Sequence, residues 1–249
     1  MLVASGVLVW ELRYRTDTTV TPVDVDVVVS LFQQHAAAAA GDTDVLPANG
    51  VYTYTTTGSD QVDALGGASH RYPVLSTITV TRSGCGATQR WVAAEERWDE
   101  FTTCVTADEN GQRVRLTDVT AFHRFFGADE RETYTCEGDP RPIGAPAGTT
   151  WVTTCTKSDG DDVQTWTGTV IGGETINVGG DAVAVEHVAV MITDSEPENS
   201  QRTDSWYLAG TDLVVRRVIA NTTTNGSPVG DVHYVEHADI TLSSLTPTR

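Results

Sequence analysis

From Gly50 to the end of the chain, apolar and polar residues alternate with a period of two, which is the signature of β-strands. The sequence also contains 38 Thr and 32 Val among 249 residues, and strands favour such β-branched side chains. The joining segments are too short for crossover helices, so successive strands must be antiparallel. Tight hairpin turns are predicted at Asn110-Gly111, Gly172-Gly173, Gly179-Gly180 and Asn225-Gly226. These features predict an all-β fold, a curved antiparallel sheet.

Strands are expected over residues 51–57, 74–81, 89–92, 97–104, 112–126, 150–156, 163–171, 183–193, 203–208, 213–219 and 231–242. Short similarities at an offset of 98 residues, such as Thr77–Val80 with Thr175–Val178, suggest an internal duplication. Its copies would be residues 49–147 and 148–245. Chance similarity is the alternative, because the chain is so rich in Thr and Val.

One amphipathic helix precedes the strands, within a segment comprising residues 16–48. Thr21 is expected as its N-cap, Pro22 occupies the first helical position, and Asp24 is the capping-box acid. An apolar stripe follows at helical spacing: Val25, Val28, Val29 and Phe32. Residues 36–40 can prolong the helix to Gly41, before a loop over residues 42–49. The stripe is expected to pack against the sheet.

Residues 1–15 begin with ten mostly apolar residues, too few to span a bilayer, which needs about 20. Trp10, Tyr14 and the flanking arginines are typical of the place where an anchor helix leaves the membrane. We interpret residues 1–15 as the remnant of a membrane anchor. A short edge strand or a frayed tail is the alternative. The β domain would then comprise residues 49–249.

Cys85, Cys104, Cys136 and Cys155 are separated by 19, 32 and 19 residues, and none forms a C-x-x-C pair. An even count with a repeated local spacing favours two disulfides, and we prefer Cys85–Cys104 with Cys136–Cys155 among the three connectivities. Each closure would contribute about 3 kcal/mol by the loop-entropy estimate. Disulfides indicate a compartment outside the cytoplasm. Four buried thiols are the alternative.

The net charge of −18 would repel a phosphate backbone and argues against nucleic-acid binding. The segment from His233 to His237 fits the H-x-x-E-H pattern of zinc hydrolases, which requires a helix. Here it is expected to be a strand that turns His233 and His237 to one face and Glu236 to the other. A metal-dependent hydrolase using these histidines therefore stays a secondary hypothesis.

Other candidate sites are weak. Glu186-His187 falls where the alternation of its strand slips, which favours a β-bulge over catalysis. The acidic segment 159–162 is interpreted as a hairpin turn, not a calcium site. The glycine pairs do not form a phosphate-binding loop. No catalytic residue, metal ligand or cofactor is predicted.

The run from Glu174 to Val190, continued by Asp204–Leu208 and Leu213–Arg216, is similar to the consecutive long strands of LolA-like envelope half-barrels. These include mycobacterial lipoproteins of the LppX/LprG kind and related secreted families of unknown function. The resemblance covers residues 148–245 and implies a half-barrel. The chain lacks a lipobox cysteine and carries four internal cysteines, so lipid carriage does not transfer directly. Its Lys-poor, Arg-rich composition also resembles that of actinobacterial proteins.

Together these features predict a non-catalytic, membrane-anchored, extracytoplasmic protein that binds or carries a hydrophobic or lipid ligand. The ligand is expected between the sheet and the helix around Val25 to Phe32. A protein-interaction scaffold without a small ligand is the further alternative. The inner face of the sheet discriminates between them, since a wide apolar cavity favours transport and a packed interior favours scaffolding.

Overall fold

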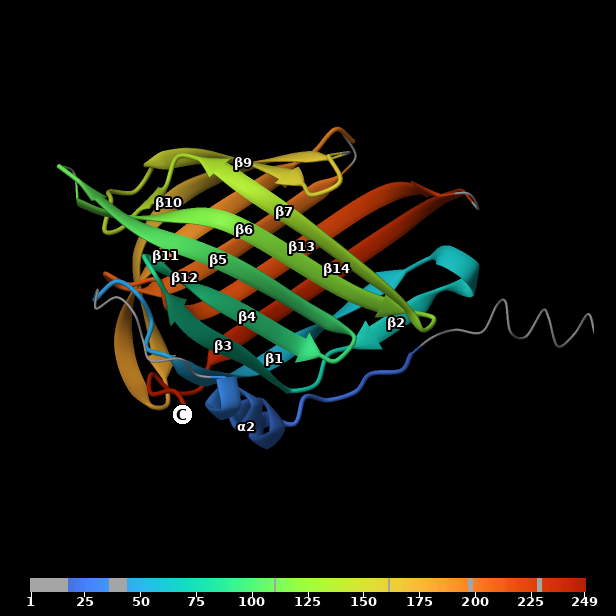
Figure 1. The fold of residues 1–249 in the computed structure, drawn as a ribbon, viewed down its shortest axis with the longest axis horizontal. Coiled ribbons are helices and arrows are strands. Elements are labelled where there is room, and N and C mark those ends of the chain that lie inside the picture. The colour runs from blue at the N-terminus through green and yellow to red at the C-terminus, as the bar shows by residue number, and fades with distance from the viewer. Residues whose placement is uncertain (1–17, 36–43, 110, 161, 197–198, 228–229) are drawn as a thin grey trace, which may run out of the picture.

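The computed structural model describes residues 18–35, 44–109, 111–160, 162–196, 199–227 and 230–249. Their strands form one antiparallel sheet that closes into a barrel (Figure 1). The closure is made by β1 (Gly50–Val62) and β14 (Gly230–Leu242), which pair from Tyr54↔Leu242 to Val62↔Tyr234. The ring contains twelve strands, namely β1, β3 to β7 and β9 to β14.

The remaining strands of the ring are β3 (Leu75–Ser83), β4 (Gly86–Ala94), β5 (Arg97–Asp108), β6 (Gly111–Phe125), β7 (Ala128–Gly138), β9 (Thr150–Lys157), β10 (Val163–Val178), β11 (Asp181–Thr193), β12 (Ser200–Leu208) and β13 (Val214–Ser227). Two short strands lie off the ring: β2 (Ala68–Arg71) pairs with β1, and β8 (Arg141–Pro142) pairs with β6. A 3-10 turn, η1 (Ala64–Gly66), precedes β2.

The predicted all-β fold with a helix packed against the sheet is confirmed. The sheet curves further than the half-barrel that the resemblance implies, because β1 and β14 join its two ends. Closure satisfies the backbone groups that an open edge would expose.

Two predicted turns are wrong. Gly172-Gly173 lies inside β10, next to a register shift against β11, and Asn225-Gly226 lies inside β13. In both places the ladder of the long hairpin continues past the glycine, so pairing across the hairpin overrides the local turn preference. Gly179-Gly180 does form the predicted turn, with φ angles of 60° and 103°. Asn110 lies outside the described residues, between β5 and β6.

The helix α2 (Val25–His35) lies outside the barrel, beside β1 and the C-terminus (Figure 1). Its N-cap is Asp24, whose carboxylate accepts hydrogen bonds from the backbone N–H groups of Asp26 and Val27. The predicted cap, Thr21, instead donates its hydroxyl and its N–H to Glu96 at the start of β5. Thr21 is thus held four residues before the helix begins.

Several sequence predictions fall on residues outside the described part of the chain, namely the anchor over residues 1–15 and the alanine extension over residues 36–40. Within the described residues, no helix is both long enough and apolar enough to cross a bilayer.

The two disulfides are Cys85–Cys104 and Cys136–Cys155, the connectivity that the spacing favours. Cys85 lies in the turn before β4 and joins β5. Cys136 and Cys155 lie opposite each other on β7 and β9, and both are buried against Val119 and Tyr134. The second disulfide therefore belongs to the barrel interior.

The interior is unevenly filled. On the side of β1, β3, β4 and β12 to β14, large side chains pack into a continuous core that includes Tyr52, Tyr54, Trp91, Ile240 and Leu242. The opposite side, formed by β5 to β7 and β9 to β11, contributes smaller clusters. This asymmetry leaves room inside the barrel.

Candidate functional site

The barrel contains a cavity of about 310 Å³, lined by inward-facing side chains of β4 to β7 and β9 to β14. This volume lies at the lower end of the range for sites that bind small molecules. Phe101, Leu116 and Trp166 point into the cavity and are only partly buried. Further apolar lining comes from Val119, Val190, Ile192 and Ile219. The barrel's own side chains therefore do not fill its interior.

One wall of the cavity depends on a glycine. Trp151 of β9 lies directly over Gly168 of β10, and a Cβ atom on Gly168 would stand 2.1 Å from the indole ring. Only glycine leaves room for this packing, and the large ring then covers the glycine backbone. Trp151 is 8 % exposed and lines the cavity.

A first buried charge cluster surrounds Arg97 of β5. Its guanidinium donates hydrogen bonds to both oxygens of Asp99 and to both oxygens of Glu236 on β14, at 2.9 and 3.0 Å for Glu236. Glu236 also accepts from the Tyr72 hydroxyl at 2.7 Å and from the Asn221 amide at 3.2 Å. Such saturation is what makes buried ionic groups tolerable.

The two carboxyls of this cluster differ electrostatically. Burial opposes ionisation of both. At Glu236 the charge and hydrogen bonds of Arg97, together with the hydrogen bond from Tyr72, outweigh burial and hold the pKa below its usual value. Burial prevails over Arg97 at Asp99, whose pKa is raised. Burial also raises the pKa of Tyr72 far above its usual value, so this hydroxyl stays protonated and donates to Glu236.

His123 of β6 borders the same cluster. Its Nε2 forms a 3.0 Å hydrogen bond with the Tyr234 hydroxyl, and its ring stacks beside Phe125. Burial, with the nearby charge of Arg97, lowers the pKa of His123 to about 3. The imidazole is therefore neutral at physiological pH.

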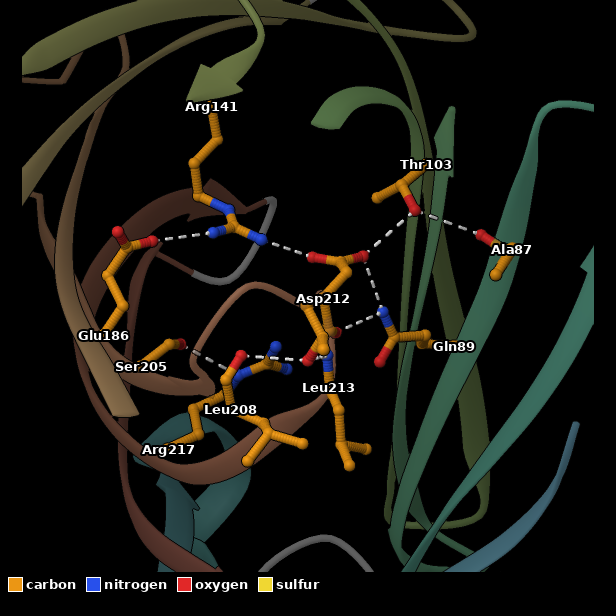
Figure 2. Close-up of polar contacts among 11 residues, drawn as sticks. Ala87, Gln89, Thr103, Arg141, Glu186, Ser205, Leu208, Asp212, Leu213 and Arg217 are labelled. Atoms are coloured by element: carbon orange, nitrogen blue, oxygen red, sulfur yellow. Dashed lines mark hydrogen bonds and ion pairs between the residues drawn. The ribbon is translucent and has the colours of Figure 1, made fainter. Parts of the chain in front are cut away.

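A second charge cluster lies around Arg141, which follows β7 and reaches into the barrel (Figure 2). Arg141 donates to Glu186 at 3.3 Å and to Asp212 at 2.6 Å, and its guanidinium lies 3.9 Å from the centre of the Tyr207 ring. The other oxygen of Asp212 accepts from Gln89 and Thr103. Arg141 thereby ties β11, the β12–β13 connection and β8 together.

The third buried guanidinium belongs to Arg217 of β13, which also lines the cavity. Its Nε donates to the Ser205 hydroxyl at 3.3 Å (Figure 2). Its Cζ lies 5.0 Å from the centre of the Phe101 ring. In the described part of the chain, no carboxylate is paired with it.

The structure separates the residues of the proposed zinc motif. His233 and His237 are exposed on the outer face of β14, where His233 bonds the Thr224 hydroxyl. Glu236 points inward to Arg97. The histidines and the glutamate therefore cannot act on one metal-bound water, as the strand interpretation predicts. Among the described residues, no group of three His, Cys, Asp or Glu side chains could hold a metal ion.

The cavity does not lie where the ligand was expected, between the sheet and the helix, because no residue of α2 lines it. The helix covers the outer surface near β1, with Phe32 buried and Val27 and Leu31 more than half exposed. The space is inside the barrel, because closure turns the concave face of the sheet into an enclosed lumen.

The Glu186-His187 region is irregular, as expected, although the inserted residue lies across from it in β10, between Val170 and Gly172. Glu186 turns inward to Arg141, and His187 lies on the outside between Glu174 and Asp204. The acidic segment after Lys157 leads from β9 into β10, in accord with the predicted hairpin turn.

Sequence reasoning missed the three buried arginines. A usable signal exists for Arg217, because it occupies the phase of Val215 and Ile219 in the alternation of its strand. A charged residue in the apolar phase indicates a buried partner or a ligand. Arg97 and Arg141 lie near strand ends, where the alternation is too short to assign a face.

No protein-family model matches the chain, and no curated protein matches it. Among solved structures, the chain is similar to the hypothetical lipoprotein YmcC from Escherichia coli (K12). The identity is 14 %, over 79 % of this chain and 85 % of that one, with a TM-score of 0.34. A likeness at this level supports no statement about function.

Proposed function

We propose that this protein is a non-catalytic, extracytoplasmic protein that binds or carries a hydrophobic or lipid-like molecule inside its barrel. The observation that carries the proposal is the 310 Å³ cavity, whose lining includes Phe101, Leu116 and Trp166. A barrel built only as a scaffold gains stability by filling its interior, so unfilled apolar lining favours a ligand.

Two further features support the proposal. Two disulfides suit an oxidising compartment outside the cytoplasm. The sequence of residues 148–245 resembles that of LolA-like envelope proteins. Residues 1–15 would hold the protein at the membrane.

Native mass spectrometry tests the proposal, with the protein analysed as purified, after organic extraction, and after incubation of the extracted protein with a lipid extract. We expect an adduct that extraction removes and incubation restores. Val190→Trp should prevent it, because Val190 faces the cavity. Met191→Trp is the matched control, since the next side chain along β11 is exposed on the outer face. Absence of any adduct in all three states would contradict the proposal and favour a scaffold.

A further inference from the structure

The buried arginines of the barrel differ in what they bind. Arg97 and Arg141 are 3 % and 6 % exposed, and each is paired with two carboxylates. An incoming anion would have to displace one of these partners. Arg217 is 9 % exposed, donates to the Ser205 hydroxyl and lies beside the Phe101 ring, and its charge acts on the Asp99 carboxyl without a direct ion pair between the two in the described part of the chain.

A buried guanidinium without a directly bonded carboxylate is costly, because its charge has lost water without gaining a hydrogen-bonded opposite charge. The Nε of Arg217 is bound to Ser205, which leaves its two terminal amino groups available on the cavity side. Two adjacent N–H groups of a guanidinium match the two oxygens of a carboxylate in a bidentate pair.

Beyond Arg217, apolar side chains continue along one side of the cavity wall. Arg217 pairs with Ser205, and the next inward row toward the β13–β14 turn holds Ile219, Thr203 and Val190. The following row holds Ile192 beside the polar Gln201 and Asn221. Phe101 packs against Arg217 from the facing wall. A chain of methylene groups that starts at Arg217 would therefore lie along Ile219, Val190 and Ile192.

We propose that the cavity takes an amphiphile with a carboxylate headgroup, which pairs with Arg217 while its apolar tail lies along Ile219, Val190 and Ile192. This inference rests on the proposed function and names the chemical class of the ligand.

Isothermal titration calorimetry with sodium dodecanoate and dodecan-1-ol tests the inference, because the two differ only in the headgroup. Wild-type protein should bind dodecanoate at least about tenfold more tightly than the alcohol, as expected for one charged hydrogen-bonded pair. Arg217→Gln should bring the ratio close to one and leave the affinity for the alcohol unchanged.

The matched control is Arg216→Gln. Arg216 is the adjacent residue, lies on the outer face and is paired with Asp239. This variant should keep the wild-type preference. If Arg217→Gln does not fold, Arg217→Lys serves instead. This variant should keep part of the preference for dodecanoate over the alcohol, because lysine retains the positive charge but lacks the two adjacent N–H groups of the guanidinium. Acetate should not compete with dodecanoate, since the tail supplies most of the buried area.

The outcomes separate the inference from the proposed function. Equal affinities of the wild-type protein for acid and alcohol would overturn the role of Arg217 and leave the cavity as an uncharged lipid site. Competition by acetate would identify a site for free anions and contradict an amphiphile. Saturable binding of neither dodecyl compound would overturn the proposed function and this inference with it.

Discussion

At the scale of single residues, the barrel interior combines apolar lining with ionic groups that hold its walls together. Arg97 joins β5 to β14 through Glu236, and Arg141 joins β8 to β11 and to the β12–β13 connection. Because these clusters are buried and their groups are mutually bonded, removing one partner should cost far more than breaking a surface pair.

Glu236→Ala should lower the free energy of unfolding by about 3–5 kcal/mol, because Arg97 loses one of its two carboxylates and the hydroxyl of Tyr72 loses its acceptor. Asp239→Ala is the control on the same strand, since it breaks the half-buried outer pair with Arg216 and should cost less than about 1 kcal/mol. Urea denaturation measures both. If Glu236→Ala lowers the free energy of unfolding no more than Asp239→Ala does, the Arg97 cluster stabilises the protein no more than a surface ion pair.

The pH dependence of stability should show the neutral state of His123. Its folded pKa of about 3 lies below the ordinary 6.5, so below pH 6.5 the unfolded chain binds a proton that the folded chain does not. The contribution of the neutral His123 side chain to the free energy of unfolding is fully present above pH 6.5 and is lost as the pH falls toward 3. The slope from this one group approaches about 1.4 kcal/mol per pH unit.

His123→Gln should remove that slope between pH 6 and pH 5, measured by urea denaturation at several pH values. His233→Gln, at an exposed position on the outer face of β14, should leave the wild-type profile unchanged. A profile of His123→Gln that parallels the wild type would show that the His123 side chain titrates alike in the folded and unfolded chain.

Assigning a single side chain to one face of a strand from the sequence depended on how long the alternation of apolar and polar residues continues in that strand. In β14 it assigned His233 and His237 to one face and Glu236 to the other, as found. It could not find the pairing of Glu236 with Arg97, because the two residues are 139 positions apart.

At the scale of elements, the β9–β10 pair forms the cavity wall through the contact of Trp151 with Gly168. The contact needs a glycine because the indole occupies the space of a side chain. Strand β10 carries two more glycines, and at one of them, Gly173, a Cβ atom would meet only the Val185 carbonyl oxygen at 3.9 Å.

Gly168→Ala should destabilise the protein by about 1–3 kcal/mol and shift its tryptophan fluorescence, because the new methyl group displaces the Trp151 ring. Gly173→Ala should change stability by less than about 0.5 kcal/mol, as is usual where no contact is disturbed. Thermal and urea unfolding with fluorescence detection compare the two. Unchanged stability and fluorescence in the Gly168→Ala variant would mean that the Trp151 ring does not pack over residue 168.

Most strand positions and both disulfides were predictable because they depend on local spacing, but β7 (Ala128–Gly138) was not expected from the sequence. Two hairpin turns were not, because Gly172 and Asn225 carry the local preference of a turn while the register of neighbouring strands extends the ladder past them. The helix cap moved from Thr21 to Asp24 for a similar reason, since Glu96 binds Thr21 from a distant strand.

At the scale of the whole molecule, the closing contact joins segments at opposite ends of the fold. The pairing of β1 with β14 leaves no trace in local alternation, so the sequence indicated a curved sheet and not its closure. Closure also decides where a ligand can lie. In an open half-barrel the helix would cover the concave face, whereas here α2 lies outside the ring.

The measurement that tests this account most directly is a set of intermolecular NOEs between bound dodecanoate and ¹³C-labelled methyl groups of the protein. We predict NOEs from the ligand chain to lumen methyls of Leu116, Val190, Ile192 and Ile219. NOEs to Val27 and Leu31 on the exposed side of α2, without any to the lumen methyls, would contradict a ligand site inside the barrel.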